Sequence, residues 1–254
     1  MEKKIIYYEN ELEDEFSSAK INAITIDENY PYKHNKLWDF CSFLIQNIIS
    51  MPIKYFYVKW KFHIKLVGKE KFKVCKKTGY FIYANHTQEF ADTFIPSLAN
   101  YPKRNFFIVN PENVSMKGLK KLVPLLGAIP IPQNVKGFKN FLKVIDECIH
   151  KGRSITIYPE AHIWPYYTKI RPFKDTSFKY PVELDVPIFI LTNTYYRNKK
   201  YEKANITTYI DGPFFPNKNV SKKDAQKELR NIAYEKMLEC SKKSTYEYII
   251  YQKK

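Results

Sequence analysis

Cysteine is scarce in this sequence, and the four cysteines are far apart. Cys41, Cys75, Cys148 and Cys240 form no CxxC pair and do not cluster with histidine. This arrangement is not the clustered spacing of a cysteine-based metal site. We therefore expect reduced, structural thiols, as in a cytosolic protein.

Long hydrophobic runs and low-complexity segments are also missing. The first nine residues contain a short apolar run followed by an acid, which is not the pattern of a signal peptide. The most apolar stretch, Leu37–Ile53, is 17 residues long and marginal for crossing a bilayer. We find no internal repeat. These absences predict a protein that stays inside the cell, with one main domain and an N-terminal appendage.

Apolar, aromatic and basic residues are abundant. Hydrophobic residues make up 44% and aromatic residues 17% of the sequence, which is enough apolar surface for a folded core. The formal net charge is +16, with acids gathered at 9–15 and nine lysines against one glutamate between Lys54 and Lys77. Such a field fits an anionic partner, whether nucleic acid, anionic lipid or a phosphorylated substrate. Coding bias towards lysine is the competing explanation.

Leu37–Ile53 has the pattern of an amphipathic helix. Its polar residues follow one another at spacings of three and four, which puts them in one narrow stripe of a helix. They are Asp39, Ser42, Gln46 and Ser50. Together with Trp38 and the lysines after Pro52, such a helix could lie in the interface of a membrane. The alternative is that it packs on the core of the domain.

From Gly79 onward, short β-rich runs alternate with helical segments. Val, Ile, Phe, Tyr and Thr content predicts strands at Tyr80–Ala84, Phe106–Val109, Ala128–Ile131, Ser154–Tyr158, Val186–Thr192 and Ile206–Ile210. Helical spacing links Phe138 to Ile149, and Ser221 with Asp224 caps a last helix that runs to about Lys242. The alternation predicts an α/β domain with a mostly parallel sheet covered by helices. We place it at residues 79–254, after a lead-in and amphipathic helical segment at 1–78.

In such sheets, functional residues gather on the loops beyond the carboxyl ends of the strands. The first such loop reads Asn85-His86-Thr87-Gln88-Glu89-Phe90-Ala91-Asp92. A histidine with a carboxylate a turn later suits a general base, because the carboxylate can fix the tautomer and stabilise the imidazolium. A helix cap with surface acids would give the same pattern, so the residues alone leave both readings open.

Two further segments carry candidate binding residues. The loop after Ser154–Tyr158 contains polar side chains that could converge on a phosphate or a glycerol hydroxyl. They are Glu160, His162, Arg171 and Lys174. Before the strand at Ala128, Gly127 permits a close approach of the backbone.

The order of these segments resembles the glycerolipid acyltransferase family, whose best-known members acylate lysophosphatidate to phosphatidate. That family pairs His with Asp, then has a Gly-containing strand, a Glu-Gly-Thr-Arg loop followed by Phe-Lys, and a Val-Pro-Ile strand. The matching residues occur here in that order across residues 80–192. They are His86 and Asp92, Gly127–Ile131, Glu160 with Phe173-Lys174, and Val186-Pro187-Ile188.

The resemblance implies an acyltransferase that needs no bound cofactor and no metal. His86, oriented by Asp92, would act as general base on a hydroxyl of lysophosphatidate or a related lysolipid. Acyl-CoA or acyl-carrier protein would be the thioester co-substrate. The substrate-binding residues would be Glu160, Gly127, His162, Arg171 and Lys174. The protein would sit on an anionic membrane surface, peripheral at its cytoplasmic, inner face.

Two departures from the family pattern bear on the site. Five residues separate His86 from Asp92 where the family has four, so Glu89 is a rival orienting acid. The sequence Glu-Ala-His-Ile at 160–163 stands where the family has Glu-Gly-Thr-Arg, so the phosphate-binding arginine is absent. Either its place is taken by another cation, or the acceptor is not a phosphomonoester. The candidate cations are Arg171, Lys174, Lys136 and Lys139.

Two other functions remain open from the sequence. Aromatic side chains interleave with the lysines between Tyr55 and Phe72, as in proteins that bind nucleic acid. No DNA- or RNA-binding signature accompanies them, so we expect no nucleic-acid partner. A family member that has lost catalysis and binds lipid would explain both departures, but not the retention of His86, Asp92 and Glu160.

Overall fold

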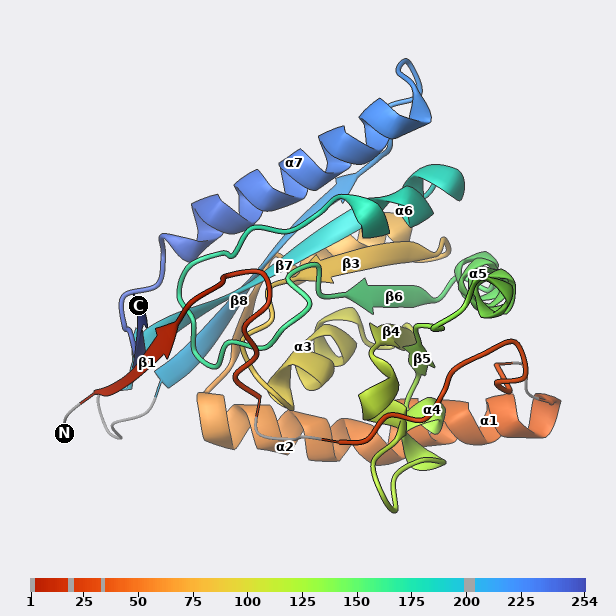
Figure 1. Cartoon of the computed structure of the whole chain (residues 1–254), viewed down its shortest axis with the longest axis horizontal. Coiled ribbons are helices and arrows are strands. Elements are labelled where there is room, and N and C mark those ends of the chain that lie inside the picture. Colours follow the sequence, from red (N-terminus) through yellow and green to blue (C-terminus); the bar gives the residue numbers. More distant parts are fainter. Residues whose placement is uncertain (1–2, 18–20, 33–34, 199–203) are drawn as a thin grey trace.

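A seven-stranded sheet forms the centre of the computed structural model, which describes residues 3–17, 21–32, 35–198 and 204–254 (Figure 1). The strand order is β2-β8-β7-β3-β6-β4-β5. The strands are β2 (Lys65–Val67), β3 (Tyr80–Ala84), β4 (Asn105–Val109), β5 (Ala128–Pro130), β6 (Ser154–Ile157), β7 (Ile188–Arg197) and β8 (Ala204–Phe214). All neighbours run parallel except β7 and β8, which confirms the predicted mostly parallel sheet.

Helices cover both faces of the sheet, as predicted (Figure 1). The α-helices after β3 are α3 (Ala91–Asn100), α4 (Leu122–Leu125), α5 (Val135–His150), α6 (Lys179–Glu183) and α7 (Lys222–Ser241). Short 3₁₀ turns lie at η2 (Lys69–Cys75), η3 (Pro111–Val114) and η4 (Thr176–Phe178). Successive β3 side chains divide between two cores, with Phe81 and Tyr83 packing beside α5 and α7, and Tyr80 and Ile82 beside α3. Burial on both faces explains why β3 reads as a continuous apolar run.

The two chain ends form a small sheet of their own. β1 (Lys4–Tyr8) pairs in parallel with β9 (Ile249–Lys253), and neither strand is anticipated from the sequence. The Tyr8 and Phe16 rings lie 4.7 and 5.2 Å from Trp164, and the Tyr251 ring stacks on it at 5.0 Å. The termini therefore pack on the loop that follows β6.

Two element boundaries differ from the sequence expectation. β7 begins at Ile188 rather than Val186, because the intervening Pro187 has no N–H to donate to the ladder. β2 lies before residue 79 but pairs with β8 in the main sheet. The seven-stranded sheet thus takes residues from both sides of the expected division at residue 78, and that division stays a prediction.

The N-terminal helix docks through its polar stripe. It is a continuous rod of α1 (Lys36–Leu44), a π-helical stretch η1 (Ile45–Ile49) and α2 (Ser50–Phe62). Ser42 Oγ donates to the Leu125 carbonyl oxygen at 2.7 Å, and Gln46 Nε2 donates to the same oxygen at 3.1 Å. Asp39 pairs with Arg104 and Arg153 at 2.8 and 2.7 Å. The stripe therefore faces the domain, where distant segments satisfy its hydrogen bonds.

The opposite, apolar side of the same rod is exposed. Leu37 keeps 69% of its surface in solvent and Trp60 keeps 75%. The other large exposed side chains are Phe40, Phe43, Ile48, Ile49, Ile53, Tyr55 and Phe56. This arrangement reverses the usual amphipathic helix, whose apolar side covers a core. We call this surface the apolar face. Within the described residues, no helix has the length and hydropathy required to cross a bilayer.

Lys54 is a buried charged residue on the inward side of α2. It is 5% exposed, its Nζ lies 3.4 Å from Ser97 Oγ, and burial lowers its pKa to about 8. An unfolded lysine has a pKa near 10.4, so the folded state binds this proton less tightly. We expect Lys54→Met to raise the free energy of unfolding at pH 7 by about 2–3 kcal/mol. Chemical denaturation of both proteins measures the difference.

The pH dependence of that gain has a definite sign. Between pH 8 and about 10.5 the unfolded chain of the native protein holds more protons at Lys54, so its stability rises with pH. The advantage of Lys54→Met should shrink across this window and vanish above it. Lys73→Met, at an exposed lysine, serves as the matched control and should change little. A Lys54→Met protein less stable than the native one would show that the ammonium group is well paired.

Candidate active site

His86 and Asp92 meet at the carboxyl end of β3. His86 lies on the loop after that strand and Asp92 in the first turn of α3. Their Nδ1 and Oδ2 atoms are 2.8 Å apart, and the His86 side chain keeps 16% exposure while the Asp92 side chain keeps none. Hydrogen bonding to a carboxylate assigns the proton to Nδ1 and leaves the lone pair on Nε2. This is the geometry of a base whose second nitrogen can accept a proton.

The loop accommodates its extra residue by wrapping the Asp92 carboxylate. Oδ2 also accepts from the main-chain N–H groups of Thr87 and Gln88, at 2.7 and 2.8 Å. Burial raises the pKa of the Asp92 carboxyl above its ordinary value, while His86 and the two main-chain donors oppose that rise. Asp92, not Glu89, is thus the carboxylate that the structure places on the His86 ring.

Asn193 on β7 holds the other oxygen of Asp92, a contact not anticipated from the sequence. Its Nδ2 donates to Asp92 Oδ1 at 3.0 Å. Thr208 Oγ1 donates to Asn193 Oδ1 at 2.6 Å, which fixes the orientation of the amide. The Asn85 side chain accepts from the Asn193 main-chain N–H at 2.8 Å and donates to the Asn193 carbonyl oxygen at 3.1 Å. The available signal was an asparagine within a run of strand-forming residues, since an amide buried in a strand must find partners.

We expect Asn193→Leu to lower kcat by about 10- to 100-fold, because a hydrogen bond to a buried charged group contributes about 1.5–3 kcal/mol. KM should change little, since Asn193 acts through Asp92. The control is Thr192→Val, whose hydroxyl is buried without a hydrogen-bond partner among the described residues. Steady-state kinetics of both variants check this, and an equal loss in the two would refute a specific role for Asn193.

Glu160 is buried and links two loops. Its Oε2 accepts from the main-chain N–H of His86 at 2.9 Å, and its Oε1 accepts from that of Arg171 at 2.8 Å. Burial raises the pKa of the Glu160 carboxyl, and the Arg171 charge opposes this. Glu160 therefore contacts the candidate base through the backbone, at a position where it can fix the His86 loop.

Arg171 is also in the interior. It is 1% exposed, and its Nη2 lies 3.7 Å from Glu160 Oε2. The guanidinium donates to the carbonyl oxygens of Glu11 and His162, and burial lowers its pKa. The arginine thus joins the N-terminal segment to the loop after β6.

No described hydrogen bond or ion pair joins His162, Lys174 or Gly127 to His86 or Asp92. Partly exposed His162 pairs with Glu15 at 3.1 Å, and Lys174 is exposed. Gly127 lies towards the amino edge of the sheet, away from His86, where an added Cβ would come 2.9 Å from the Asn105 carbonyl oxygen. Its φ of +99° and this close approach are structural reasons for a glycine at position 127.

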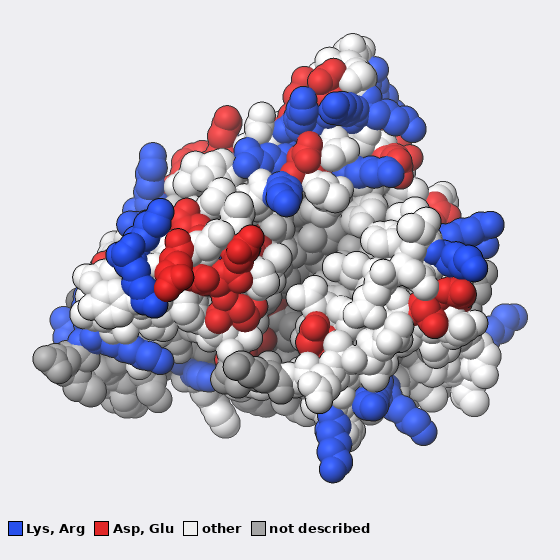
Figure 2. All heavy atoms as spheres, viewed as in Figure 1, with Lys and Arg blue, Asp and Glu red and all other residues white. Residues whose placement is uncertain are grey.

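An acidic N-terminal segment borders the loop after β6. Glu15 also accepts from the Ile163 N–H at 3.1 Å, and Trp164 Nε1 donates to the Asp14 carbonyl oxygen at 2.7 Å. Figure 2 shows acidic side chains gathered to one side of the central hollow on this face. The positive field of the whole chain is therefore not uniform around the site.

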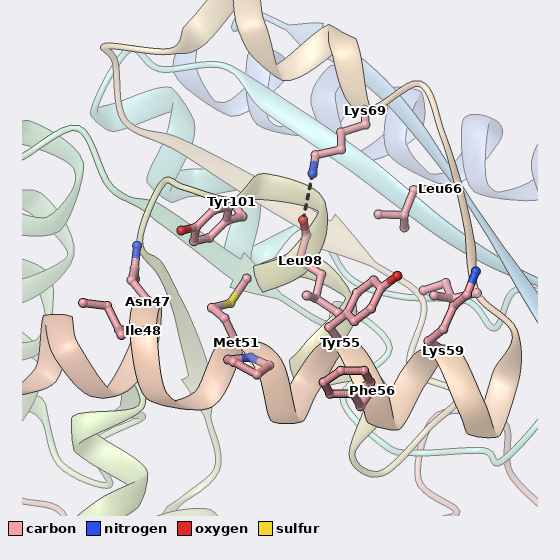
Figure 3. A pocket seen from close by; sticks show the side chains of 12 residues that line it. Asn47, Ile48, Met51, Tyr55, Phe56, Lys59, Leu66, Lys69, Leu98 and Tyr101 are labelled. Carbon is pink, nitrogen blue, oxygen red and sulfur yellow. Dashed lines mark hydrogen bonds between the residues drawn. The ribbon is translucent and has the colours of Figure 1, made fainter.

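A separate groove of about 740 Å³ lies between α2, β2 and the C-terminal end of α3 (Figure 3). Its walls are largely apolar, with Met51 and Leu98 among them, and its lysines are Lys59 and Lys69. Ile48 and Phe56 line the groove and also belong to the apolar face. The groove therefore continues that surface into the domain.

Comparisons with known proteins agree with this architecture. A family model described as Acyltransferase matches residues 63–192. The crystal structure of the 1-acyl-sn-glycerophosphate (LPA) acyltransferase PlsC from Thermotoga maritima is similar, with a TM-score of 0.56 and 18% sequence identity. The match covers 83% of this chain and 89% of that one, and at this identity it shows the shared fold. No curated protein matches the sequence.

Proposed function

The chain belongs to the acyltransferase family, and from that premise we propose that it moves a fatty acyl group from a thioester to a hydroxyl of lysophosphatidate or a related lysolipid. The observation that carries the proposal is the His86–Asp92 pair, at 2.8 Å with the carboxylate fully enclosed. Acyl-CoA or acyl-carrier protein is the proposed co-substrate, with no bound cofactor.

In the proposed reaction, His86 acts as general base. Its Nε2 takes the proton of the acceptor hydroxyl as the oxygen attacks the thioester carbonyl carbon. The tetrahedral intermediate collapses, the C–S bond breaks, and the sulfur leaves with the proton from His86 as a free thiol. Asp92 stabilises the imidazolium while it exists. An ester and a thiol are released, and the histidine returns to its neutral form.

The acceptor headgroup must be bound without the arginine of the family pattern. Arg171 is enclosed beside Glu160, so its charge is already compensated. The exposed candidates are Lys174, in the loop after β6, and Lys136 and Lys139 in the first turns of α5. We propose that these lysines provide the positive charge for a phosphate-bearing acceptor.

We also propose that the protein is peripheral at the cytoplasmic face of a membrane and that this membrane, not nucleic acid, is its anionic partner. The apolar face supports this, because contiguous exposed apolar surfaces mark interaction sites. Trp60 and the neighbouring lysines suit the headgroup zone. An apolar acceptor could then reach the domain without leaving the bilayer surface.

Binding to vesicles tests the apolar face directly. We expect Ile49→Ser with Ile53→Ser to weaken binding to anionic vesicles by about a hundredfold, since burying each side chain contributes about 1.5 kcal/mol or more. Both residues are exposed, so thermal stability should not fall. Val74→Ser, at an equally exposed apolar residue of η2, is the control. Unchanged vesicle sedimentation in the double variant would place the contact elsewhere.

The function itself is tested by free-thiol release from acyl-CoA and acyl-carrier protein, with lysophosphatidate in anionic vesicles and mass analysis of the lipid product. Acceptor-dependent release with formation of phosphatidate is the expected result. Release with another lysolipid only would change the acceptor and keep the chemistry. Vesicle binding without release from any donor would favour the alternative of a non-catalytic lipid-binding member of the family.

A further inference from the structure

The Tyr158 ring lies flat against the candidate base. Tyr158 follows β6, the neighbour of β3 in the sheet. Its ring centroid is 4.3 Å from that of His86, with 21° between the planes. Contact at this distance limits rotation of the imidazole about the axis that its hydrogen bond to Asp92 defines.

The Tyr158 hydroxyl has an unusual acceptor inside α3. It donates to the main-chain carbonyl oxygen of Asp92. In an α-helix that oxygen normally accepts from the N–H four residues later. Here that residue is Pro96, which has no N–H and whose ring crowds the same carbonyl. Pro96 therefore leaves an open acceptor, and the phenol occupies it.

The phenol is suited to stay in this position. Burial raises the pKa of Tyr158 well above its ordinary value, so the hydroxyl remains a protonated donor. The carbonyl in turn would be left unsatisfied in a buried place if the hydroxyl moved away. The proline and the tyrosine thus depend on each other, although they are 62 positions apart in the sequence.

We propose that Tyr158 is a positioning residue for His86, anchored by the backbone acceptor that Pro96 leaves open at Asp92. This inference rests on the proposed role of His86 as general base. Asp92 then orients the imidazole twice, through its carboxylate to Nδ1 and through its carbonyl to the ring that stacks on it. The hydrogen bond fixes the direction of the imidazole and the stacked ring fixes its plane, so Nε2 keeps one direction.

A double-mutant cycle tests this dependence. Tyr158→Phe should lower kcat about tenfold and leave KM within about twofold, because the ring loses its anchor but substrate contacts remain. Pro96→Ala alone should lower kcat by a similar factor, because its restored main-chain N–H takes the Asp92 carbonyl from the phenol. In the double variant no anchor remains to be lost, so kcat should stay within about twofold of that of Tyr158→Phe. Thermal melting of all four proteins shows whether each is folded.

The kcat of the double variant is the decisive outcome. A merely structural tyrosine, needed only to satisfy the Asp92 carbonyl, would leave Pro96→Ala at the native kcat and let the double variant recover to it, and that result would overturn the proposal. A native kcat in Tyr158→Phe would overturn it as well.

A second readout does not depend on acyl transfer. The proton NMR signals of the His86 ring should carry a ring-current shift in the native protein that Tyr158→Leu removes. If transfer is not observed with any donor, the same signals still show whether the His86 orientation changes in Tyr158→Phe and stays changed in the double variant. An unchanged His86 signal in both Tyr158 variants would refute the stacked arrangement. Failure of the proposed function and failure of this inference are therefore distinguishable.

Discussion

Replacing His86 by alanine is expected to lower kcat by about a thousandfold, the range expected for loss of a general base. The acceptor hydroxyl would then have to lose its proton to water as it attacks the thioester. KM should change little, because the partly exposed imidazole is assigned a role in proton transfer and not in holding the lipid. Thiol release with saturating donor and acceptor measures the loss.

The carboxylates supply the controls for that result. Asp92→Asn keeps the shape of the side chain but removes the charge that stabilises the imidazolium, so kcat should fall by about 10- to 100-fold. Glu89→Gln should stay near the native rate, since it is Asp92 that contacts His86 at 2.8 Å. A larger loss in Glu89→Gln than in Asp92→Asn would reverse this assignment and require a rearranged loop.

The central strands and the long helices could be predicted because their signals are local. β3 is a run of five buried residues between Gly79 and Asn85, and Ser221 caps α7 through a hydrogen bond to the Asp224 N–H. β1 and β9 gave no such signal. Each is short and partly exposed, and each has its pairing partner at the other end of the chain. Pairing at that distance leaves no local periodicity.

The orientation of the N-terminal helix shows a different limit. Periodicity identified the polar stripe of Asp39, Ser42 and Gln46 but could not say which side faces the domain. That depends on partners far along the chain, since Arg104 and Arg153 neutralise Asp39. An amphipathic pattern defines two sides, and only tertiary contacts decide which one is covered.

The site residues likewise divide into those with a local sequence signal and those brought in by tertiary contacts. His86 and Asp92 could be proposed from the sequence because they are six positions apart on one loop. Asn193 and Tyr158 could not, because they reach the loop only through the adjacency of β7 and β6 to β3. Arg171 is the clearest case, since its sequence position suggested a ligand while its burial joins it to Glu160.

Removing the Arg171 charge should therefore lower the free energy of unfolding more than it weakens substrate binding. Arg171→Met keeps much of the packing against Trp164 but leaves Glu160 buried without its cation. Breaking a buried ion pair from one side costs about 3–5 kcal/mol, and we expect the free energy of unfolding at pH 7 to fall by about this amount. Denaturant titration measures it. Lys174→Met, at an exposed lysine of the same loop, should leave stability nearly unchanged.

The pH dependence separates this ion-pair effect from loss of packing. Burial already raises the pKa of Glu160, and removing Arg171 takes away the main opposing charge, so the folded state would bind the proton still more tightly. As pH falls through that raised pKa, the carboxyl becomes neutral in the folded protein and the penalty disappears. The stability gap between native and Arg171→Met proteins should thus narrow at acidic pH. A gap that stays constant with pH, together with a rise in KM for lysophosphatidate, would instead mean that Arg171 reaches the acceptor.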